Sequence, residues 1–407
     1  MKTNRTRRMP VTDASLLKQI NYARILSVLR RTPHLPRAEI ARQTGLTRST
    51  ITVITAELID KGLVREGGET ITGQNGGRPG VGLALNPEGA FFIGAAIGAE
   101  TLTVVELNLA AQVVNRIQTS IGDNRTPETV IRSLVTLIQQ VQQANPLNTD
   151  RLRGVGLTVP GTLNLDGVVV RAPLLNWQEI DLRSHLESLI DLPLFVDNDA
   201  NAAALAEVYL GSAIECSSLL YLLLDTGVGG GIVIDNRVYR GAYGTASEVC
   251  ELIVDPNGDR TDGDEPGKLG PLVEKAGLLK RYQQQSGEAA DLALLVSKLQ
   301  AGDAIAHAVV QEWAKFLGWG LTSLVNILNP ERVVLGGQLT VLLPYVKEPL
   351  DAMLRDCVPG TGVYGFFSNA KSRFEISEFG EDSAAIGGAV LAYQSLFQVP
   401  DLVLLQR

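Results

Sequence analysis

Apolar positions near the start of the chain recur at intervals of three and four residues, which predicts a helix with one buried face. These positions are Leu16, Ile20, Ala23, Leu26 and Leu29. Two further helices are predicted in PRAEIARQTGLTRSTITVITAELIDKGLV, where Gly45 suits a tight turn and Thr47 can cap the third helix. Gly62 is a stop signal for that helix. The spacing predicts a helix-turn-helix, although an unrelated helical hairpin would have the same outline.

The outer face of the third helix carries short hydroxyl side chains and an arginine, which suit contacts with phosphates and base edges. The residues that we expect to contact DNA are Arg37, Thr47, Arg48, Ser49, Thr50, Thr52 and Arg78. Arg78 lies in GGRPG, between two short predicted strands that resemble the wing of a winged helix. An extended arginine there can enter a narrow minor groove, but Gly-Arg-Pro is also an ordinary turn.

The hydrophobic pattern changes after a turn at residues 86–89 and then predicts alternating strands and helices. Two apolar runs flank a turn at residues 91–107, and the same plan recurs at residues 219–234. This repetition predicts a duplicated α/β body with a cleft between its halves. We expect a head, two lobes and a final helix that returns to the first lobe, with an oligomerisation surface on the second lobe. Their predicted bounds are 1–85, 86–200, 201–385 and 386–407.

Charge separates the head from the body. Residues 1–85 contain 14 Lys and Arg against 6 Asp and Glu, a formal charge of +8 in a chain whose total is −8. A basic head on an acidic body predicts that the head binds a polyanion such as duplex DNA, with chance clustering as the alternative. No apolar run reaches the ~18 residues of a membrane span, and no signal peptide precedes the head. The sparse cysteines Cys216, Cys250 and Cys357 favour a reducing, cytoplasmic location.

Two segments of the body carry candidate chemistry. In LPLFVDNDANAAALAE, an apolar strand runs into Asp197, Asn198 and Asp199 just before an alanine-rich helix. Polar residues at that position point into the cleft of an open α/β sheet, and an aspartate there can accept a proton from a hydroxyl group. Asn198 and Asp199 can equally serve only as helix caps. In LLLDTGVGGGIVID, glycines let backbone N–H groups approach a phosphate.

Several motifs, in this order, carry a resemblance to a known family. They are the winged helix, GVGLTVPG, FVDNDANAAALAE, DTGVGGGIVIDNRVYRGAYGTASE, LVNILNPERVVLGG and GEDSAAIGGAVLA. Over essentially its whole length the chain resembles the ROK family of sugar kinases and sugar-responsive repressors. It is similar to the repressor branch, which includes the glucose and N-acetylglucosamine repressors. The resemblance implies an α/β protein, with an N-terminal winged helix-turn-helix followed by two ribonuclease-H-like lobes, as in actin-like ATPases.

Carried over position by position, the resemblance also implies an effector site in the cleft. Its residues are Gly161, Asn198, Asp199, Glu248, Glu251 and Glu274. Glu251 stands where the family has a histidine that binds sugar and zinc, and the family's Cys-x-Cys-x4-Cys stretch is absent from DGDEPGKLGPLVE. We therefore predict no zinc and no cofactor. Whether Asp262, Asp264 or Glu265 holds a hard cation stays open, with a solvated acidic loop as the simpler interpretation.

The first turn of the body departs from the family's first phosphate loop, which reads like Asp-x-Gly-Gly-Thr. Here Ala96 stands near the position of the aspartate, and Ala99–Glu100 stand where phosphate would lie. Because a glutamate there would repel ATP, we predict a regulator and no kinase activity. We expect a homodimer or homotetramer that binds a DNA operator and a sugar or sugar derivative. The alternatives are a sugar kinase with a DNA-binding head, and a regulator that responds to a protein partner.

Overall fold

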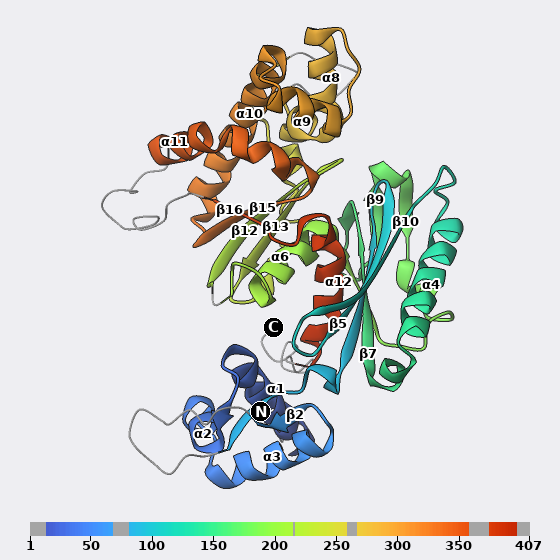
Figure 1. Ribbon diagram of the computed structural model, residues 1–407, viewed down its shortest axis with the longest axis vertical. Coiled ribbons are helices and arrows are strands. Elements are labelled where there is room, and N and C mark those ends of the chain that lie inside the picture. Colours follow the sequence, from blue (N-terminus) through green and yellow to red (C-terminus); the bar gives the residue numbers. More distant parts are fainter. Residues whose placement is uncertain (1–13, 68–80, 215, 259–266, 358–373, 397–407) are drawn as a thin grey trace, which may run out of the picture.

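The computed structural model describes residues 14–67, 81–214, 216–258, 267–357 and 374–396. They form a small head and two larger lobes (Figure 1). Four residues singled out from the sequence lie outside the described residues: Arg78, Asp262, Asp264 and Glu265. Within the described ranges no single helix is long and apolar enough to cross a membrane. One pair of consecutive helices is long and apolar enough when taken together, but it is bent by 114°: α9 (Leu292–Gln300) and α10 (Ala304–Leu328).

The head contains the three helices and the two wing strands that the sequence predicts, and a third short strand, β1 (Leu35–Pro36), that it did not predict. The other elements are α1 (Ala14–Arg31), α2 (Arg37–Thr44), α3 (Arg48–Asp60), β2 (Val64–Glu66) and β3 (Gly82–Leu85), with strand order β1-β3-β2. Gly45 follows α2 in the left-handed conformation, with a φ of 71°, and the Thr47 hydroxyl accepts a hydrogen bond from the Thr50 N–H at 3.2 Å. Pro36 lies just before α2 with an extended ψ of 151°, and it pairs with Gly82 of β3.

The first lobe is built on a five-stranded sheet in the order β11-β7-β4-β5-β6. Its strands are β4 (Phe91–Ile97), β5 (Thr101–Asn108), β6 (Val113–Ser120), β7 (Leu152–Val159) and β11 (Leu194–Asn198). The first three form an antiparallel meander, whereas β7 and β11 run parallel to β4. Helix α4 (Pro127–Ala144) covers one face of this sheet. The lobe also contains β8 (Thr162–Leu163), β9 (Val169–Ala172), β10 (Trp177–Ile180) and α5 (Leu182–Leu186).

The second lobe repeats the same plan in a sheet of order β14-β13-β12-β15-β16. Its strands are β12 (Ser218–Leu224), β13 (Val228–Ile234), β14 (Arg237–Val238), β15 (Arg332–Gly336) and β16 (Glu375–Ile376). Again three strands form an antiparallel meander and the other two run parallel to the first, so the predicted duplication is confirmed. Besides α9 and α10, its helices are α7 (Leu269–Val273), α8 (Lys275–Ser286) and α11 (Lys347–Cys357).

Two helices between the sheets are exchanged between the lobes. Helix α6 (Asp199–Tyr209) follows β11 of the first sheet but packs on β12 and β13 of the second. Helix α12 (Ser383–Gln394) follows β16 of the second sheet but packs on β4 and β7 of the first (Figure 1). The two helices also pack against each other, so closely that a Cβ on Gly387 would collide with the backbone of Ala202. This pair forms the centre of the body.

The head shares a hydrophobic core with these two helices. Ile25, Leu26 and Leu29 of α1 belong to the same cluster of buried residues as Tyr209 and Tyr393. Those tyrosines lie near the C-terminal ends of α6 and α12, so the head is seated on both helix ends. The bounds assigned to the domains from the sequence stay a prediction.

Candidate functional site

A cavity of about 530 Å³ lies between the two lobes. Its walls include the turn between β4 and β5, the loop after β7, the start of α6, and the turn between β12 and β13. All six residues that the sequence assigned to an effector site line this cavity: Gly161, Asn198, Asp199, Glu248, Glu251 and Glu274. The structure thus brings the whole set together, while the role of each residue stays a prediction.

Asn198 joins the start of α6 to the loop after β7. Its side-chain oxygen accepts a hydrogen bond from the Asn201 N–H at 3.0 Å, and its side-chain nitrogen donates to the Gly161 carbonyl oxygen at 3.0 Å. Gly161 has a φ of 113°, and a Cβ there would lie 2.7 Å from the Cα of Ala172, so only glycine fits. Asn198 is therefore a helix cap, as one interpretation of the sequence had it, and also part of the cavity wall.

Asp199 and Asp225 place two carboxyl groups in the same part of the cavity. The pKa of Asp199 is raised to about 7, mainly by burial and further by the charge of Asp225. Burial also raises the pKa of Asp225, which accepts hydrogen bonds from the Thr226 N–H at 2.7 Å and from Gln338 Nε2 at 2.8 Å. Near neutral pH, Asp199 can therefore either donate or accept a hydrogen bond to a hydroxyl group.

The three predicted glutamates of the cavity differ in their partners. Glu248 accepts a hydrogen bond from the Thr162 hydroxyl at 3.0 Å, and desolvation raises its pKa. Glu251 forms an ion pair with Lys268 at 2.6 Å, so its charge is compensated. Glu274 immediately precedes α8. Across the described ranges, no group of three or more His, Cys, Asp and Glu side chains could hold a metal ion.

Polar contacts connect the two lobes around the cavity. The Arg240 guanidinium donates to Asp197 at 2.7 Å, and that carboxylate, expected in the cleft, is only 1% exposed. Lys275 at the start of α8 forms an ion pair with Glu100 in the first turn at 2.7 Å. The sequence did not identify Arg240 or Lys275, because each partner lies far away along the chain. The sequence predicted that Glu100 would repel ATP. In the structure the charge of Glu100 is compensated by Lys275.

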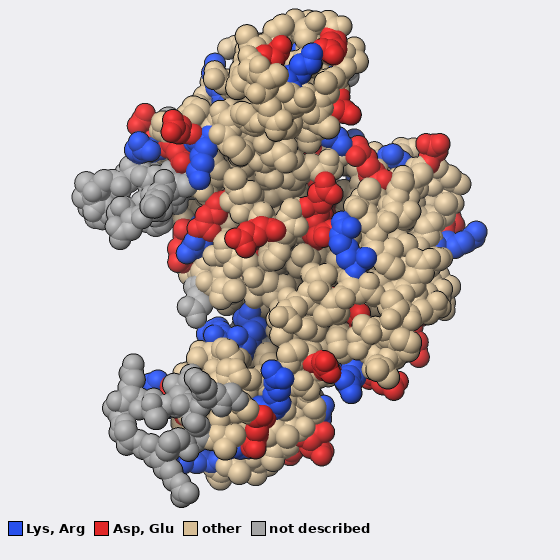
Figure 2. Space-filling model, viewed as in Figure 1, with Lys and Arg blue, Asp and Glu red and all other residues tan. Residues whose placement is uncertain are grey.

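The cavity is nevertheless acidic. Eight of its lining residues are Asp or Glu, whereas only Arg171 and Arg240 are basic. Arg240 is already paired with a carboxylate, as described above. On the face shown in Figure 2, acidic and basic side chains lie next to each other at the boundary between the lobes. The cavity therefore favours uncharged or cationic molecules over anions.

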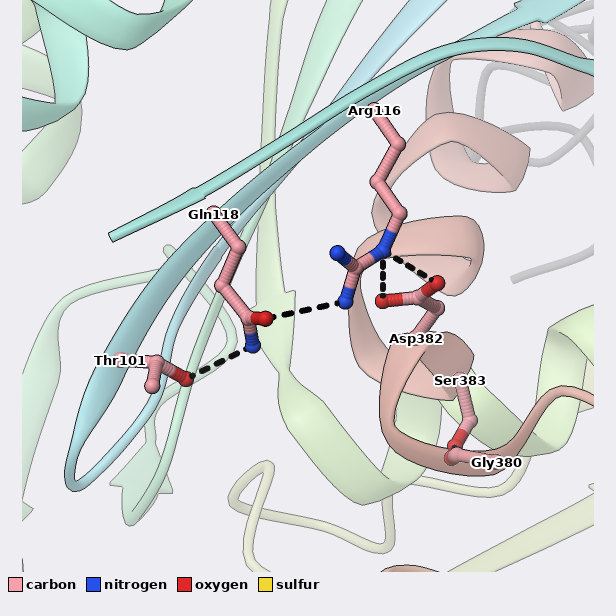
Figure 3. A network of polar contacts seen from close by, with 6 residues as sticks. All are labelled: Thr101, Arg116, Gln118, Gly380, Asp382 and Ser383. Carbon is pink, nitrogen blue, oxygen red and sulfur yellow. Dashed lines mark hydrogen bonds and ion pairs between the residues drawn. The ribbon is translucent and has the colours of Figure 1, made fainter. Parts of the chain in front are cut away.

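A polar network holds the start of α12 on the first lobe at one edge of the cavity (Figure 3). Arg116 on β6 donates from Nε to both carboxylate oxygens of Asp382, at 2.8 and 2.7 Å. Its guanidinium also donates to Gln118 Oε1 at 3.1 Å, and Gln118 Nε2 donates to Thr101 Oγ1 at 3.5 Å. Gln118, Thr101 and Ser383 line the cavity, so the network connects a cavity wall to the first turn of α12.

A second candidate surface lies on the head. Arg48, Ser49 and Thr52 are exposed on α3, and the Thr50 hydroxyl bonds to that of Thr47. The sequence missed Val53, which is 58% exposed on the same helix. Its methyl groups suit contact with the methyl group of thymine.

Arg37 differs from the other residues predicted to contact DNA. Its Nε donates to the Thr55 hydroxyl at 3.1 Å, and its guanidinium forms an ion pair with Glu66 at 2.7 Å. Arg37 therefore connects α2 to α3 and β2 within the head. Arg78 is not among the described residues, so its contribution stays a prediction.

Comparisons with known proteins agree with this arrangement. The ROK family model matches residues 92–395, and a winged helix-turn-helix DNA-binding model matches residues 23–65. A xylose repressor of Caldicellulosiruptor bescii is 28% identical over 401 residues, covering 95% of this chain and 98% of that protein. A glucokinase of Halalkalibacterium halodurans is 28% identical over 324 residues, covering 75% and 95%. The crystal structure of a ROK family transcriptional regulator, a homologue of the E. coli MLC protein, has a TM-score of 0.80 and 26% identity, covering 95% of this chain and 98% of that one.

Proposed function

Because the chain belongs to the ROK family and carries a winged helix-turn-helix ahead of the ROK body, we propose that it is a cytoplasmic transcriptional repressor of carbohydrate-related genes. A sugar or sugar derivative, bound between the lobes, controls its affinity for DNA. The observation that carries this proposal is that six residues, assigned to an effector site from the sequence, line one cavity. A xylose repressor that matches nearly the whole chain, head included, supports the same function.

The head reads the operator through α3. Arg48, Ser49, Thr50 and Thr52 contact base edges and phosphates in the major groove, and Arg78 enters the minor groove. Thr47 and Arg37 add contacts to phosphate while they hold α3 in place. Two heads are needed to bind two half-sites about one helical turn apart, so the protein acts as a homodimer or homotetramer.

The effector is an uncharged polyhydroxylated molecule. Asn198, Asp199, Glu248, Glu251 and Glu274 offer acceptors and an amide to neighbouring hydroxyl groups, and Gly161 gives the ligand room. A phosphorylated sugar fits poorly, because five carboxyl groups of the cavity wall remain beside one arginine, Arg171, after the ion pairs of Glu100, Glu251 and Asp197 are set aside. No metal is required for this mode of binding.

The protein is not a kinase in this proposal. Phosphoryl transfer by two phosphate loops and a bound magnesium needs both turns of the cavity to accept phosphate. The first turn instead carries Glu100, whose ion pair with Lys275 occupies that position. A sugar kinase with a DNA-binding head is the second candidate, favoured by the glycines of the second turn and by the glucokinase relative.

Three measurements on the purified protein test the function. Gel shifts with duplexes from upstream of carbohydrate genes, at low salt, should show binding that Arg48→Ala and Arg78→Ala weaken and that Arg132→Ala, an exposed site on α4, leaves unchanged. Thermal melting with a panel of neutral sugars should identify a stabilising ligand. Sugar-dependent ATP turnover that Asp199→Asn abolishes would establish the kinase instead. DNA binding without any stabilising sugar would favour control by a protein partner.

A further inference from the structure

The DNA-binding head is seated on the ends of two helices that belong to different lobes. Helix α6 packs on the second sheet and α12 packs on the first, as described above. Both helices begin at the cavity, where Asn198, Asp199, Ser383 and Ala384 form part of the wall. Both end at the head, beside α1. A relative movement of the lobes therefore displaces the two supports of the head with respect to each other.

Helix α6 can transmit such a displacement without bending. Every residue from Ala200 to Tyr209 is buried. Gly231 of β13 lies directly beneath it, where an added Cβ would approach the Ala200 carbonyl oxygen to 2.6 Å. Its eleven residues span about 16 Å, at 1.5 Å a residue, from the cavity to the head. A close-packed helix of this length moves as a unit.

Arg30 of α1 binds the end of α6 that lies next to the head. Its Nη1 donates to the Tyr209 carbonyl oxygen at 3.0 Å, and its guanidinium lies 4.6 Å from the centre of the Tyr209 ring. A cation that donates to a terminal carbonyl complements the negative end of a helix, and the aromatic face adds attraction.

The head end of α12 is fixed to the first lobe. The Tyr393 hydroxyl donates to the Leu109 carbonyl oxygen at 3.2 Å, and its ring packs edge-on against Phe92 at 5.1 Å. The Tyr209 ring packs edge-on against Tyr393 at 6.4 Å, so the two helix ends meet under α1. At the other end, the ion pair of Arg116 with Asp382 holds α12 on the same lobe (Figure 3).

We propose that Arg30 is the positioning residue that couples the cavity to the DNA-binding head. Closure of the lobes around a ligand shifts α6 against α12, and α1 follows α6 because Arg30 holds it to Tyr209. The orientation of α3, and hence the affinity for the operator, changes with it. This inference rests on the proposed function, since it requires both a ligand in the cavity and an operator on the head.

The test measures three quantities for each variant: affinity for operator DNA, affinity for the neutral sugar found in the melting panel, and the ratio of operator affinities without and with that sugar. In the unaltered protein we expect a ratio of about 5- to 150-fold. Arg30→Ala and Tyr209→Leu should bring it close to one, while sugar affinity changes less than threefold. Arg30→Lys, which keeps the charge and one donor, should restore part of the ratio. Arg24→Ala, at an exposed site on the same helix, is the matched control and should keep the full ratio.

The outcomes separate this inference from the proposed function. If the unaltered protein responds to sugar and folded Arg30→Ala and Arg30→Lys both respond equally, Arg30 does not couple the sites. If the unaltered protein binds sugar and DNA with a ratio of one, the coupling is absent and the inference fails although both sites exist. If it binds no sugar or no DNA at all, the proposed function itself fails, and the inference fails with it.

Discussion

The turn between β4 and β5 and the turn between β12 and β13 occupy equivalent places in the two lobes, and both line the cavity. The second turn has a partly buried aspartate, Asp225, followed by Thr226 and Gly227. The first turn carries Glu100, which is half exposed and paired with Lys275 from the opposite lobe. A duplicated backbone thus determines where a turn lies, whereas the side chains decide whether it can accept a phosphate or instead holds the lobes together.

Beneath the turns the two lobes remain alike. A strand glycine lies under the crossing helix in each sheet, although in different strands of the plan. Gly94 is in β4, the first strand of its meander, under α12, and Gly231 is in β13, the second strand of its meander, under α6. In both places an added Cβ would collide with the helix backbone. Each sheet therefore needs a glycine where a helix crosses it, whereas the chemistry of the two turns differs, and substitutions can separate these two levels.

The largest effect should come from the shared packing. Gly231→Val would force a side chain into the Ala200 carbonyl oxygen and the Ala204 Cβ, which lies 2.7 Å from an added Cβ. We expect a loss of about 3 kcal/mol or more in the free energy of unfolding. Gly227→Ala at the turn meets only Leu174 Cδ1, at 3.2 Å, and should cost less than about 1 kcal/mol. Urea unfolding measures the free energy of unfolding of both variants. Equal losses would show that the contact of Gly231 with α6 does not set the cost of its replacement.

The next effect should fall on ligand binding. Asp199→Asn removes a carboxyl group from the cavity wall, and at a pH above 7, where this group is ionised, we expect sugar binding to lose about 1.5–3 kcal/mol, or about 10- to 150-fold in affinity. Binding of operator DNA without sugar should stay the same, because the head is remote from this carboxyl group. Titration calorimetry with the sugar and gel shifts with DNA measure the two. An unchanged sugar affinity would place the effector site elsewhere.

The pH dependence of the free energy of unfolding tests whether Asp199 is protonated in the folded protein. The folded-state pKa of Asp199, about 7, lies above its ordinary value of 3.8, so the folded protein holds a proton that the unfolded chain has lost. The stability from this protonated group is complete below about pH 4 and is lost as pH rises through 7, by at most about 1.4 kcal/mol per pH unit. Urea unfolding of the unaltered protein and of Asp199→Asn, compared between pH 4 and 8, isolates this slope. A difference between them that does not vary with pH would contradict it.

The smallest effect should come from the first turn. Glu100→Gln breaks the ion pair with Lys275, which is partly exposed and should contribute less than about 1 kcal/mol to stability. The released lysine should strengthen binding of a phosphorylated sugar several-fold, as measured by thermal melting. Glu381→Gln also removes a carboxylate of the cavity wall, but releases no lysine, and is the matched control. Equal gains in the two variants would mean that overall charge, and not this pair, excludes phosphate.

Local patterns predicted much of this molecule from the sequence. The stripe of α3, the left-handed Gly45 and the Thr47 cap depend on neighbours within a few residues, and so does the repeated strand–turn–strand plan. Asn198 and Asp199 followed from the strand end before α6, but the other four cavity residues required the family resemblance, because they come from three further segments. The pairing of Glu100 with Lys275, 175 residues away, had no local signal, and neither had the contact of Arg30 with Tyr209. Both depend on how finished elements pack in three dimensions.

The exchange of α6 and α12 has a consequence for synthesis on the ribosome. The last strand of the first sheet ends at Asn198, yet the face under α12 stays open until residues 383–394 have emerged. At ~5–20 residues per second, that delay is on the order of ten to forty seconds. During it the nascent chain exposes apolar surface and carries a head whose second support does not yet exist. We therefore expect the first lobe and the seat of the head to be complete only when α12 has packed on the first sheet.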